Sequence, residues 1–191
     1  MSLGNNALVS LDEVKQFYFP NMDKSKSQDD DLLEELINRI TSQFEKYCGI
    51  TTFHDDDYTE YTDSVGACIF TKNQPINSIT SIALDTDWTW GTDSTCTTTD
   101  YRIINDSYVL FKYQIGNYDS NVKIIYNGGY ETIPADLKHS CIKEVAREYK
   151  HRQDFDILSK SLEDGSNTVI SPGLMFSTIQ ILDKYKRIRA F

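Results

Sequence analysis

Two kinds of sequence pattern follow one another along this chain, and their order limits the folds that it can adopt. From residue 51 to residue 130, short runs of β-branched and aromatic residues are separated by residues that favour turns. Before and after this region, apolar residues recur at three- and four-residue steps, which indicates amphipathic helices. The order predicts helices at both ends that bracket one β-rich insertion.

The strongest helical signal lies at about residues 30–48. Its apolar residues fall on one face, Asp29, Asp30 and Asp31 lie at its N-terminus, and Gly49 follows at a position that favours a left-handed residue. The apolar stripe consists of Leu33, Leu36, Ile37, Ile40, Phe44, Tyr47 and Cys48. This segment is expected to be a central element of the core.

Three further helices are predicted. Ser10 and Glu13 form the S-x-x-E capping box of a helix at about 10–19, and Pro134 begins one at about 134–152. A fourth is expected at about 174–188. With a β insertion at about 55–128, the predicted fold class is α+β: mainly a helical bundle from the N- and C-terminal helices, with an inserted antiparallel β subdomain.

The glycine pair in YNGGYETIP has the spacing of a corner between a strand and a helix. Gly128 and Gly129 permit a tight reversal before Pro134 begins the next helix. A P-loop requires GxxxxGK[ST], and a dinucleotide-binding fold requires GxGxxG, and neither pattern occurs. A corner is therefore predicted in place of a phosphate-binding loop.

Charge and cysteine content narrow the classes of function. The formal net charge of −10 repels phosphate backbones and anionic lipid. Four scattered cysteines lack CxxC spacing and are predicted to be reduced thiols, and no segment approaches the roughly 20 apolar residues of a membrane span. A soluble cytoplasmic protein of one domain with an appendage is expected, without a membrane partner.

Signals for catalysis are weak. His54 precedes three aspartates, but their spacing suits neither a calcium loop nor a zinc site, so a solvated acidic turn is favoured over a metal site. No nucleophile elbow, HExxH helix or Cys-His signature occurs. We expect no enzyme, no cofactor and no metal.

The β region is rich in aromatic residues, which favour either a core or a protein-protein interface. About half of these rings are expected in the core and the others at an interface. The set comprises Tyr58, Tyr61, Trp88, Trp90, Tyr101, Tyr108, Phe111 and Tyr113.

Several segments occur in an order typical of one protein family. They are ALVSLDEVKQF, a long helix ending in FEKYCGI, YTEYTD, IFTKNQPINSITSI, DYRI, NVKIIYNGGYETIPADLKHSCIKEVAREYKHR and a final ILDKYKR. In this order they resemble the bacteriophage and prophage head-tail connector family, the small adaptor proteins that dock beneath the portal ring. The resemblance covers most of the chain.

The resemblance implies a single head-tail connector domain over residues 1–191. It implies a structural virion protein that forms a ring of about twelve copies beneath the portal and links the DNA-filled capsid to the tail. The implied partners are the portal protein and tail or neck proteins, while DNA passes through the lumen without specific binding. The implied location is the virion neck, and the host bacterial cytoplasm during assembly.

Three groups of residues are expected at partner contacts: basic C-terminal side chains, polar residues of the segment 154–172, and two tryptophans of the β region. They are Lys184, Lys186, Arg187, Arg189, Asp154, Gly165, Trp88 and Trp90. A plain surface loop and a solvated helix end are equally compatible with the first two groups.

Three alternatives stay open. The first is another neck or tail-completion protein that docks elsewhere in the virion. The second is a β-rich module that binds carbohydrate or peptide on a platform of Trp88 and Trp90. The third is a hydrolase that uses His54 and the neighbouring aspartates.

Overall fold

The computed structural model describes residues 2–18, 29–91, 94–116, 118–152, 159–161, 167–169 and 173–187. The chain divides into two compact units. We call them the helical unit (Met1–Phe44 and Pro134–Tyr185) and the barrel unit (Glu45–Ile133 and Lys186–Phe191). Each unit is described separately below.

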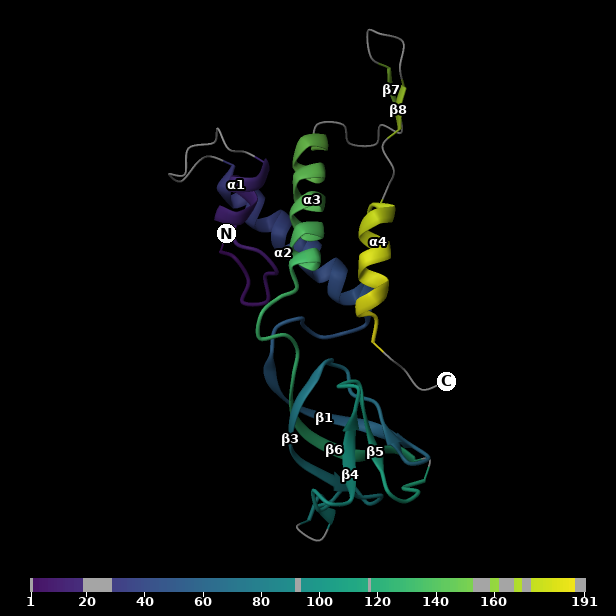
Figure 1. The fold of residues 1–191 in the computed structure, drawn as a ribbon. Helices are drawn as coiled ribbons and strands as arrows, with labels where there is room; N and C mark the ends of the chain where they lie inside the picture. Colours follow the sequence, from purple (N-terminus) through teal and green to yellow (C-terminus); the bar gives the residue numbers. More distant parts are fainter. Residues whose placement is uncertain are drawn as a thin grey trace. The chain divides into compact units, whose positions relative to one another are not determined.

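The helical unit is built around α3, which contacts α1 and α4 and lies between them (Figure 1). A two-stranded antiparallel sheet, β7 with β8, follows α3 in the chain. The elements are α1 (Leu11–Tyr18), α2 (Asp30–Cys48, whose last four residues belong to the barrel unit), α3 (Ala135–His151), β7 (Ser159–Ser161), β8 (Asn167–Val169), α4 (Phe176–Leu182) and the 3-10 helix η2 (Asp183–Tyr185).

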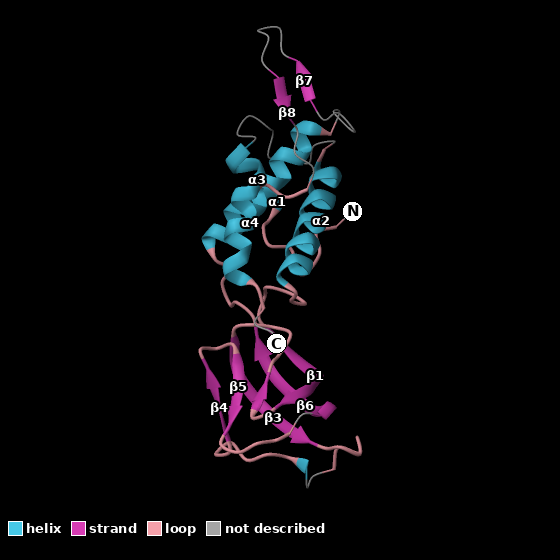
Figure 2. Cartoon of the chain, turned by 90° about the vertical axis from the view of Figure 1, so that its right-hand side faces the viewer, coloured by secondary structure: helices cyan, strands magenta, loops and turns pink. Residues whose placement is uncertain are grey.

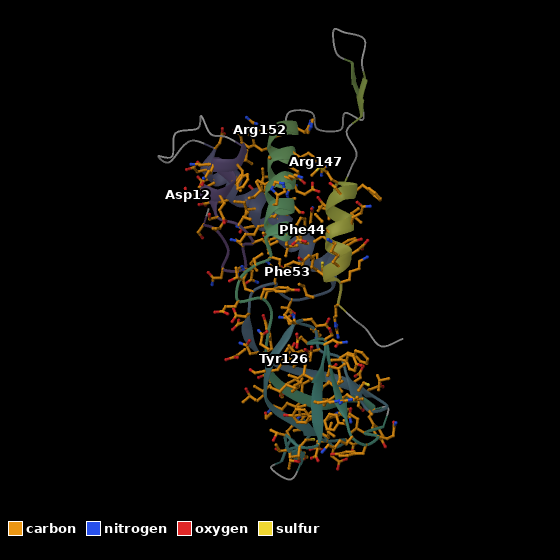
Figure 3. The ribbon with its side chains drawn as sticks, in the orientation of Figure 1. Asp12, Phe44, Phe53, Tyr126, Arg147 and Arg152 are labelled. Carbon is orange, nitrogen blue, oxygen red and sulfur yellow. The ribbon has the colours of Figure 1, made fainter. Side chains whose placement is uncertain are left out.

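Amphipathic stripes of α2 and α3 supply the core of the helical unit. Leu33, Ile37, Ile40 and Phe44 of α2 are fully buried, and Figure 3 shows Phe44 among the helices. The stripe of α3 is buried at Leu137, Cys141 and Val145, at the four-residue steps of a helix. A buried ion pair of 2.7 Å between Lys15 and Asp30 joins α1 to α2.

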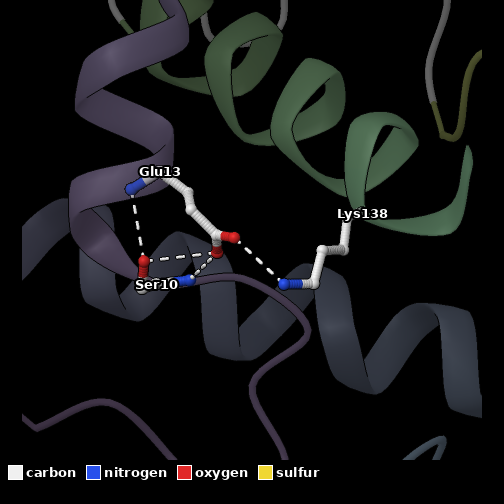
Figure 4. A network of polar contacts seen from close by, with 3 residues as sticks. All are labelled: Ser10, Glu13 and Lys138. Atoms are coloured by element: carbon white, nitrogen blue, oxygen red, sulfur yellow. Dashed lines mark hydrogen bonds and ion pairs between the residues drawn. The ribbon is translucent and has the colours of Figure 1, made fainter. Parts of the chain in front are cut away.

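The capping box predicted at the start of α1 is confirmed (Figure 4). The Ser10 N–H donates to Glu13 Oε2 at 2.8 Å, and the Glu13 N–H donates to Ser10 Oγ at 3.2 Å. Lys138 of α3 donates to the other Glu13 oxygen at 3.0 Å. Although burial acts in the opposite direction, these donors hold the pKa of Glu13 below its ordinary value of 4.5.

Six antiparallel strands form the barrel unit, in the order β3-β6-β1-β2-β5-β4. Figure 2 shows the sheet curling around its own interior. The strands are β1 (Asp56–Val65), β2 (Cys68–Ile69), β3 (Ile76–Leu84), β4 (Tyr101–Ile104), β5 (Tyr108–Phe111) and β6 (Tyr118–Gly128).

Hydrogen bonds between the two edge regions nearly close this sheet into a barrel. The Cys96 N–H donates to the Ile82 carbonyl at 2.8 Å, so the chain just before β4 meets β3. The Ile76 N–H donates to the Asp106 carbonyl at 2.6 Å, beyond the other end of β4. The core inside consists of Ile69, Ile76, Ile82, Val109, Phe111, Ile115, Val122, Ile124 and Tyr126.

The predicted fold class is wrong, because the chain is not mainly a helical bundle. The structure is mostly an antiparallel sheet that forms a nearly closed barrel, and the described residues add four short helices. The physical reason is that β6 pairs with both β1 and β3 along most of its length, which gives the insertion a core of its own. Strand runs can be read from the sequence, but these long-range pairings cannot.

The strand-to-helix corner predicted at the glycine pair is confirmed. Gly128 ends β6, and Gly129 has φ of +117°, a conformation that side chains with a Cβ rarely adopt. A Cβ at Gly129 would lie 2.2 Å from the carbonyl oxygen of His54, and the Gly129 N–H donates to the Pro75 carbonyl at 2.8 Å. Close backbone packing therefore requires this glycine.

Candidate functional site

The part of the chain that the structure describes contains exposed aromatic side chains and two buried polar networks. No three His, Cys, Asp or Glu side chains among these residues converge as a metal site. His54 forms an isolated bridge with Tyr130, and Asp56 and Asp57 begin β1. None of the described helices is long and apolar enough to span a bilayer.

A loop after β3 is held by one carboxylate, that of Asp85. Its Oδ2 accepts the Thr89 hydroxyl at 2.8 Å and the Trp90 N–H at 2.8 Å, and its Oδ1 accepts the Asp87 N–H at 2.8 Å. The hydrogen bonds from the Thr89 hydroxyl and from the backbone lower the pKa of Asp85 from its ordinary value of 3.8. The loop is therefore a defined structure, tied by an ionised carboxylate at neutral pH.

This loop places the two predicted tryptophans differently. Trp88 (φ 57°) and Trp90 (φ 53°) both adopt left-handed conformations, which are uncommon for residues with a bulky side chain. Trp88 is 62% exposed, whereas the ring of Trp90 lies 5.4 Å from that of Tyr61 and is half-buried. Strained conformations of this kind cluster at functional sites, so Trp88 is the candidate contact residue.

The barrel unit exposes more large apolar side chains than the helical unit. Among the described residues, Phe17 and Phe176 are the exposed ones of the helical unit. Those of the barrel unit are Tyr61, Val65, Trp88, Tyr113 and Tyr118. Sequence reasoning named Tyr61, Trp88 and Tyr113 among its aromatics but missed both phenylalanines.

The basic C-terminal residues contact their own chain. In the barrel unit, the Arg187 N–H donates to the Cys48 carbonyl at 2.9 Å, and its guanidinium donates to the Phe70 carbonyl at 3.2 Å. Lys186 lies 4.3 Å from the Tyr47 ring centre and donates to the Tyr47 hydroxyl at 3.1 Å. These cations therefore meet the C-terminal end of α2, where positive charge is favourable.

Lys184 belongs to the helical unit, where its side chain is 68% exposed and lies 4.0 Å from a carboxylate oxygen of Asp136. Asp154, Gly165 and Arg189 lie outside the described residues. The segment 154–172 was predicted as a loop, yet its described residues form β7 and β8.

A buried ion pair fixes the start of α4. Glu144 of α3 is fully buried; its Oε1 accepts the Met175 N–H at 2.7 Å and its Oε2 lies 2.9 Å from Arg147. Arg147 also donates to the Gly173 carbonyl. Because Met175 provides no side-chain cap, Glu144 satisfies a backbone donor that α4 would otherwise leave unpaired. Sequence reasoning missed this ion pair. It could have been found from a glutamate on the apolar stripe of α3 that is followed by an arginine three residues later.

A second buried polar network lies inside the barrel unit, around Tyr126 (Figure 3). The Tyr126 hydroxyl donates to Glu60 Oε2 at 2.9 Å and accepts the Asn73 N–H at 3.1 Å. The same carboxylate oxygen accepts the Lys72 N–H at 2.9 Å. Burial and the nearby Glu60 carboxylate raise the pKa of Tyr126, so its hydroxyl stays a proton donor. We assign this network to stability.

The family follows from the whole sequence. The sequence model of the head completion protein family matches residues 7–188. The chain belongs to the head completion protein family. The resemblance to phage head-tail adaptors drawn from the order of its segments is thereby confirmed. No curated protein matches the sequence.

Solved structures share the fold of this head completion protein over its full length. A chain from the "Neck of empty GTA particle computed with C6 symmetry" has a TM-score of 0.62 at 10% identity, covering 100% of this chain and 95% of that one. A chain from the "Virion of native gene transfer agent (GTA) particle" has a TM-score of 0.60 at 12% identity, with coverage of 100% and 95%. A chain from the "Neck of native GTA particle computed with C12 symmetry" has a TM-score of 0.54 at 11% identity, with coverage of 100% and 94%.

Proposed function

We propose that this head completion protein is a structural subunit of the virion neck. Copies form a ring of about twelve beneath the portal and link the DNA-filled head to the tail. The proposal is supported by how much of the chain is matched. The family model matches residues 7–188, and the fold of chains from GTA necks covers 100% of this chain. One of those necks was computed with C12 symmetry and another with C6, which is compatible with a ring of this size.

The protein acts by binding neighbouring virion proteins in a fixed arrangement and catalyses no reaction. Residues 1–191 act as one head-tail connector domain that needs no cofactor. The portal protein contacts one end of the ring, and a tail or neck protein contacts the other. Trp88, Lys184 and the segment 154–172 are the candidate partner contacts, because Trp88 and Lys184 are exposed and that segment contains the β7–β8 hairpin.

DNA passes through the ring without specific binding. The net charge of −10 supports this part of the proposal, because phosphate contacts would add salt-dependent adhesion. Lys186 and Arg187, the basic residues nearest the C-terminus in the described part, already contact Tyr47, Cys48 and Phe70. Measurable binding of duplex DNA by the isolated protein at low salt would count against a passive lumen.

Light scattering tests the ring directly. The mass of the purified protein is measured alone and then with the portal protein encoded in the same genome. The proposal predicts either a ring alone or a monomer that joins the portal in a fixed multiple. A monomer that does not bind the portal protein would contradict the proposal and would favour a β-rich ligand-binding module. Quenching of Trp88 fluorescence by candidate ligands would then be the next test.

A further inference from the structure

Three loops of the barrel unit meet at one end of the barrel. They connect β1 to β2, β3 to β4 and β5 to β6. The Ile115 N–H, in the loop after β5, donates to the Gly66 carbonyl, in the loop after β1, at 2.8 Å. The Lys112 N–H, at the start of the loop after β5, donates to the carbonyl of Asp100, the residue before β4, at 2.9 Å. Backbone hydrogen bonds therefore join all three loops.

The exposed large hydrophobic side chains described in the barrel unit all lie at or beside this end. The described residues at the opposite end include no exposed side chain of this kind. Single exposed apolar residues are ordinary on a protein surface, whereas a group gathered in one place marks an interaction site. We define the aromatic end as Tyr61, Val65, Trp88, Tyr113 and Tyr118.

The loop between β3 and β4 holds Trp88 outward. Its two ends are close together, because Ala83 forms a bridge with Thr95. Between them, the Asp85 carboxylate accepts the N–H groups of Asp87 and Trp90, and the Trp90 ring packs on Tyr61 at 5.4 Å. Trp88 remains 62% exposed. A ring that is positioned before binding loses less conformational entropy when it meets a partner.

The charge around the aromatic end is negative. The described residues of the three loops and of the strand ends beside them have five carboxylates and one ammonium, that of Lys112. Arg102 and Lys123, on the adjoining strands, reduce this excess without reversing it. Two such ends would bring like charges together, so contact between them is disfavoured. The carboxylates belong to Asp63, Asp85, Asp87, Asp100 and Asp119.

We propose that the aromatic end binds a neighbouring virion protein at an apolar surface edged by Lys and Arg, with Trp88 as the anchor. This inference rests on the proposed function and names the chemistry of the partner. An arginine fits both features of this end, because its guanidinium pairs with a carboxylate and stacks on an aromatic ring. Asp85 is a positioning residue, which acts by holding the loop that presents Trp88.

Substitution of Trp88 tests the anchor. The full chain is titrated with the purified portal protein and with each other neck or tail protein encoded in the same genome. Trp88→Ser should weaken binding to the partner by about ten- to a hundredfold, as expected for a central aromatic anchor. Phe17→Ser is the matched control, because Phe17 is also 62% exposed but lies in the helical unit. Thermal unfolding of both variants should match wild type.

A double-mutant cycle tests the role of Asp85. Asp85→Ala should weaken binding in the wild-type chain but add little in a chain that already carries Trp88→Ser, because the order of the loop matters through Trp88. Additive losses would overturn the positioning role. Asp57→Ala is the charge control, since Asp57 is an exposed aspartate near the start of β1, at the opposite end of the barrel.

Salt dependence tests the charge of the partner. Asp87→Lys reverses an exposed charge next to Trp88, so it should weaken binding more at about 0.05 M salt than at about 0.5 M salt. Tighter binding of Asp87→Lys at low salt would show that the partner surface is acidic and would overturn the proposal.

Two further results separate this inference from the proposed function. If the wild-type chain binds a neck, tail or portal protein and Trp88→Ser binds it equally well, the inference is overturned and the neck role stays intact. If the wild-type chain binds none of these proteins, the proposed function itself is contradicted. Self-association of the wild-type chain that is lost in Trp88→Ser would assign the aromatic end to a second copy, and would also overturn the inference.

Discussion

The helical unit and the barrel unit form their secondary structure over different distances in the chain, although polar contacts such as Lys138–Glu13 join the helices across 125 positions. In the helical unit, buried residues such as Ile37 and Phe44 repeat within one helix, and polar clamps such as Glu144–Arg147 lie between neighbouring turns. In the barrel unit, Tyr58 of β1 pairs with Tyr126 of β6, and the Tyr126 hydroxyl reaches Glu60 across 66 positions of sequence. The comparison teaches that loss of a strand breaks pairing with distant segments at once, whereas loss of a hydrogen bond within a helix acts first on that helix.

The largest expected effect is in the helical core. Phe44→Ala removes a fully buried ring and should lower the free energy of unfolding by about 3–5 kcal/mol, because a cavity remains. Denaturant unfolding followed by far-UV circular dichroism measures the change. Phe17→Ala, which truncates an exposed ring of the same unit, is the control and should be close to neutral in the monomer.

A backbone substitution tests the barrel unit at its most crowded corner. Gly129→Ala should cost about 3 kcal/mol, since the new Cβ would lie 2.2 Å from the His54 carbonyl oxygen at a φ of +117°. Hydrogen exchange at the β1–β6 amides would report the loss. Gly91→Ala, where nothing lies within 4 Å, should leave exchange unchanged. Equal effects of the two substitutions would show that the corner is not constrained.

Removal of one hydroxyl tests the polar network of the barrel. Tyr126→Phe keeps the ring but removes one of the two donors to Glu60 Oε2 and leaves the Asn73 N–H without its acceptor, at a cost of about 1–3 kcal/mol. Thermal unfolding measures it, with Tyr118→Phe as an exposed control. A neutral result would mean that water replaces the hydroxyl.

The capping box gives a smaller, local effect. Ser10→Ala should destabilise the helical unit by about 1 kcal/mol, because the Glu13 N–H loses its acceptor. Hydrogen exchange should rise at the first turn of α1 and leave the barrel amides unchanged. A change spread over both units would contradict the local character assigned to the helices.

The smallest expected effect is a pH dependence of the barrel unit. Burial raises the pKa of Glu45 from 4.5 to about 7, although the half-exposed side chain is partly screened by solvent. Between these values the unfolded chain releases a proton that the folded chain keeps, so stability should fall as pH rises from about 4.5 to about 7, and then level off. Glu45→Gln should remove this slope; a slope that persists would belong to another group.

Local patterns in the sequence located the helices better than they described the sheet. The four-residue repeat from Leu33 to Phe44 lies in α2 (Asp30–Cys48), and the capping box begins α1, because both signals involve residues within a few positions. The order β3-β6-β1-β2-β5-β4 could not be read in the same way, since β6 is inserted between strands that precede it by about 40 residues or more. The prediction that the fold is mainly a helical bundle was wrong for that reason.

Prediction of the contact residues from the sequence is limited in the same way, because it depends on which segments meet in the fold. Trp88 could be named from composition alone, because an aromatic residue in a polar stretch is either an anchor or core. That Trp90 packs on Tyr61, or that Arg187 reaches Cys48 and Phe70, depends on which segments meet in the fold. Phe176 could have been found, since it lies opposite Thr178 and Leu182 on a helical wheel.

The central claim is that this head completion protein forms a ring in the neck. The most direct measurement is a symmetric cryo-EM reconstruction of the neck of particles from the genome that encodes the chain. The account predicts density for this fold in a closed ring beneath the portal. A neck that is complete without this chain, or that contains it as a single copy, would contradict the claim.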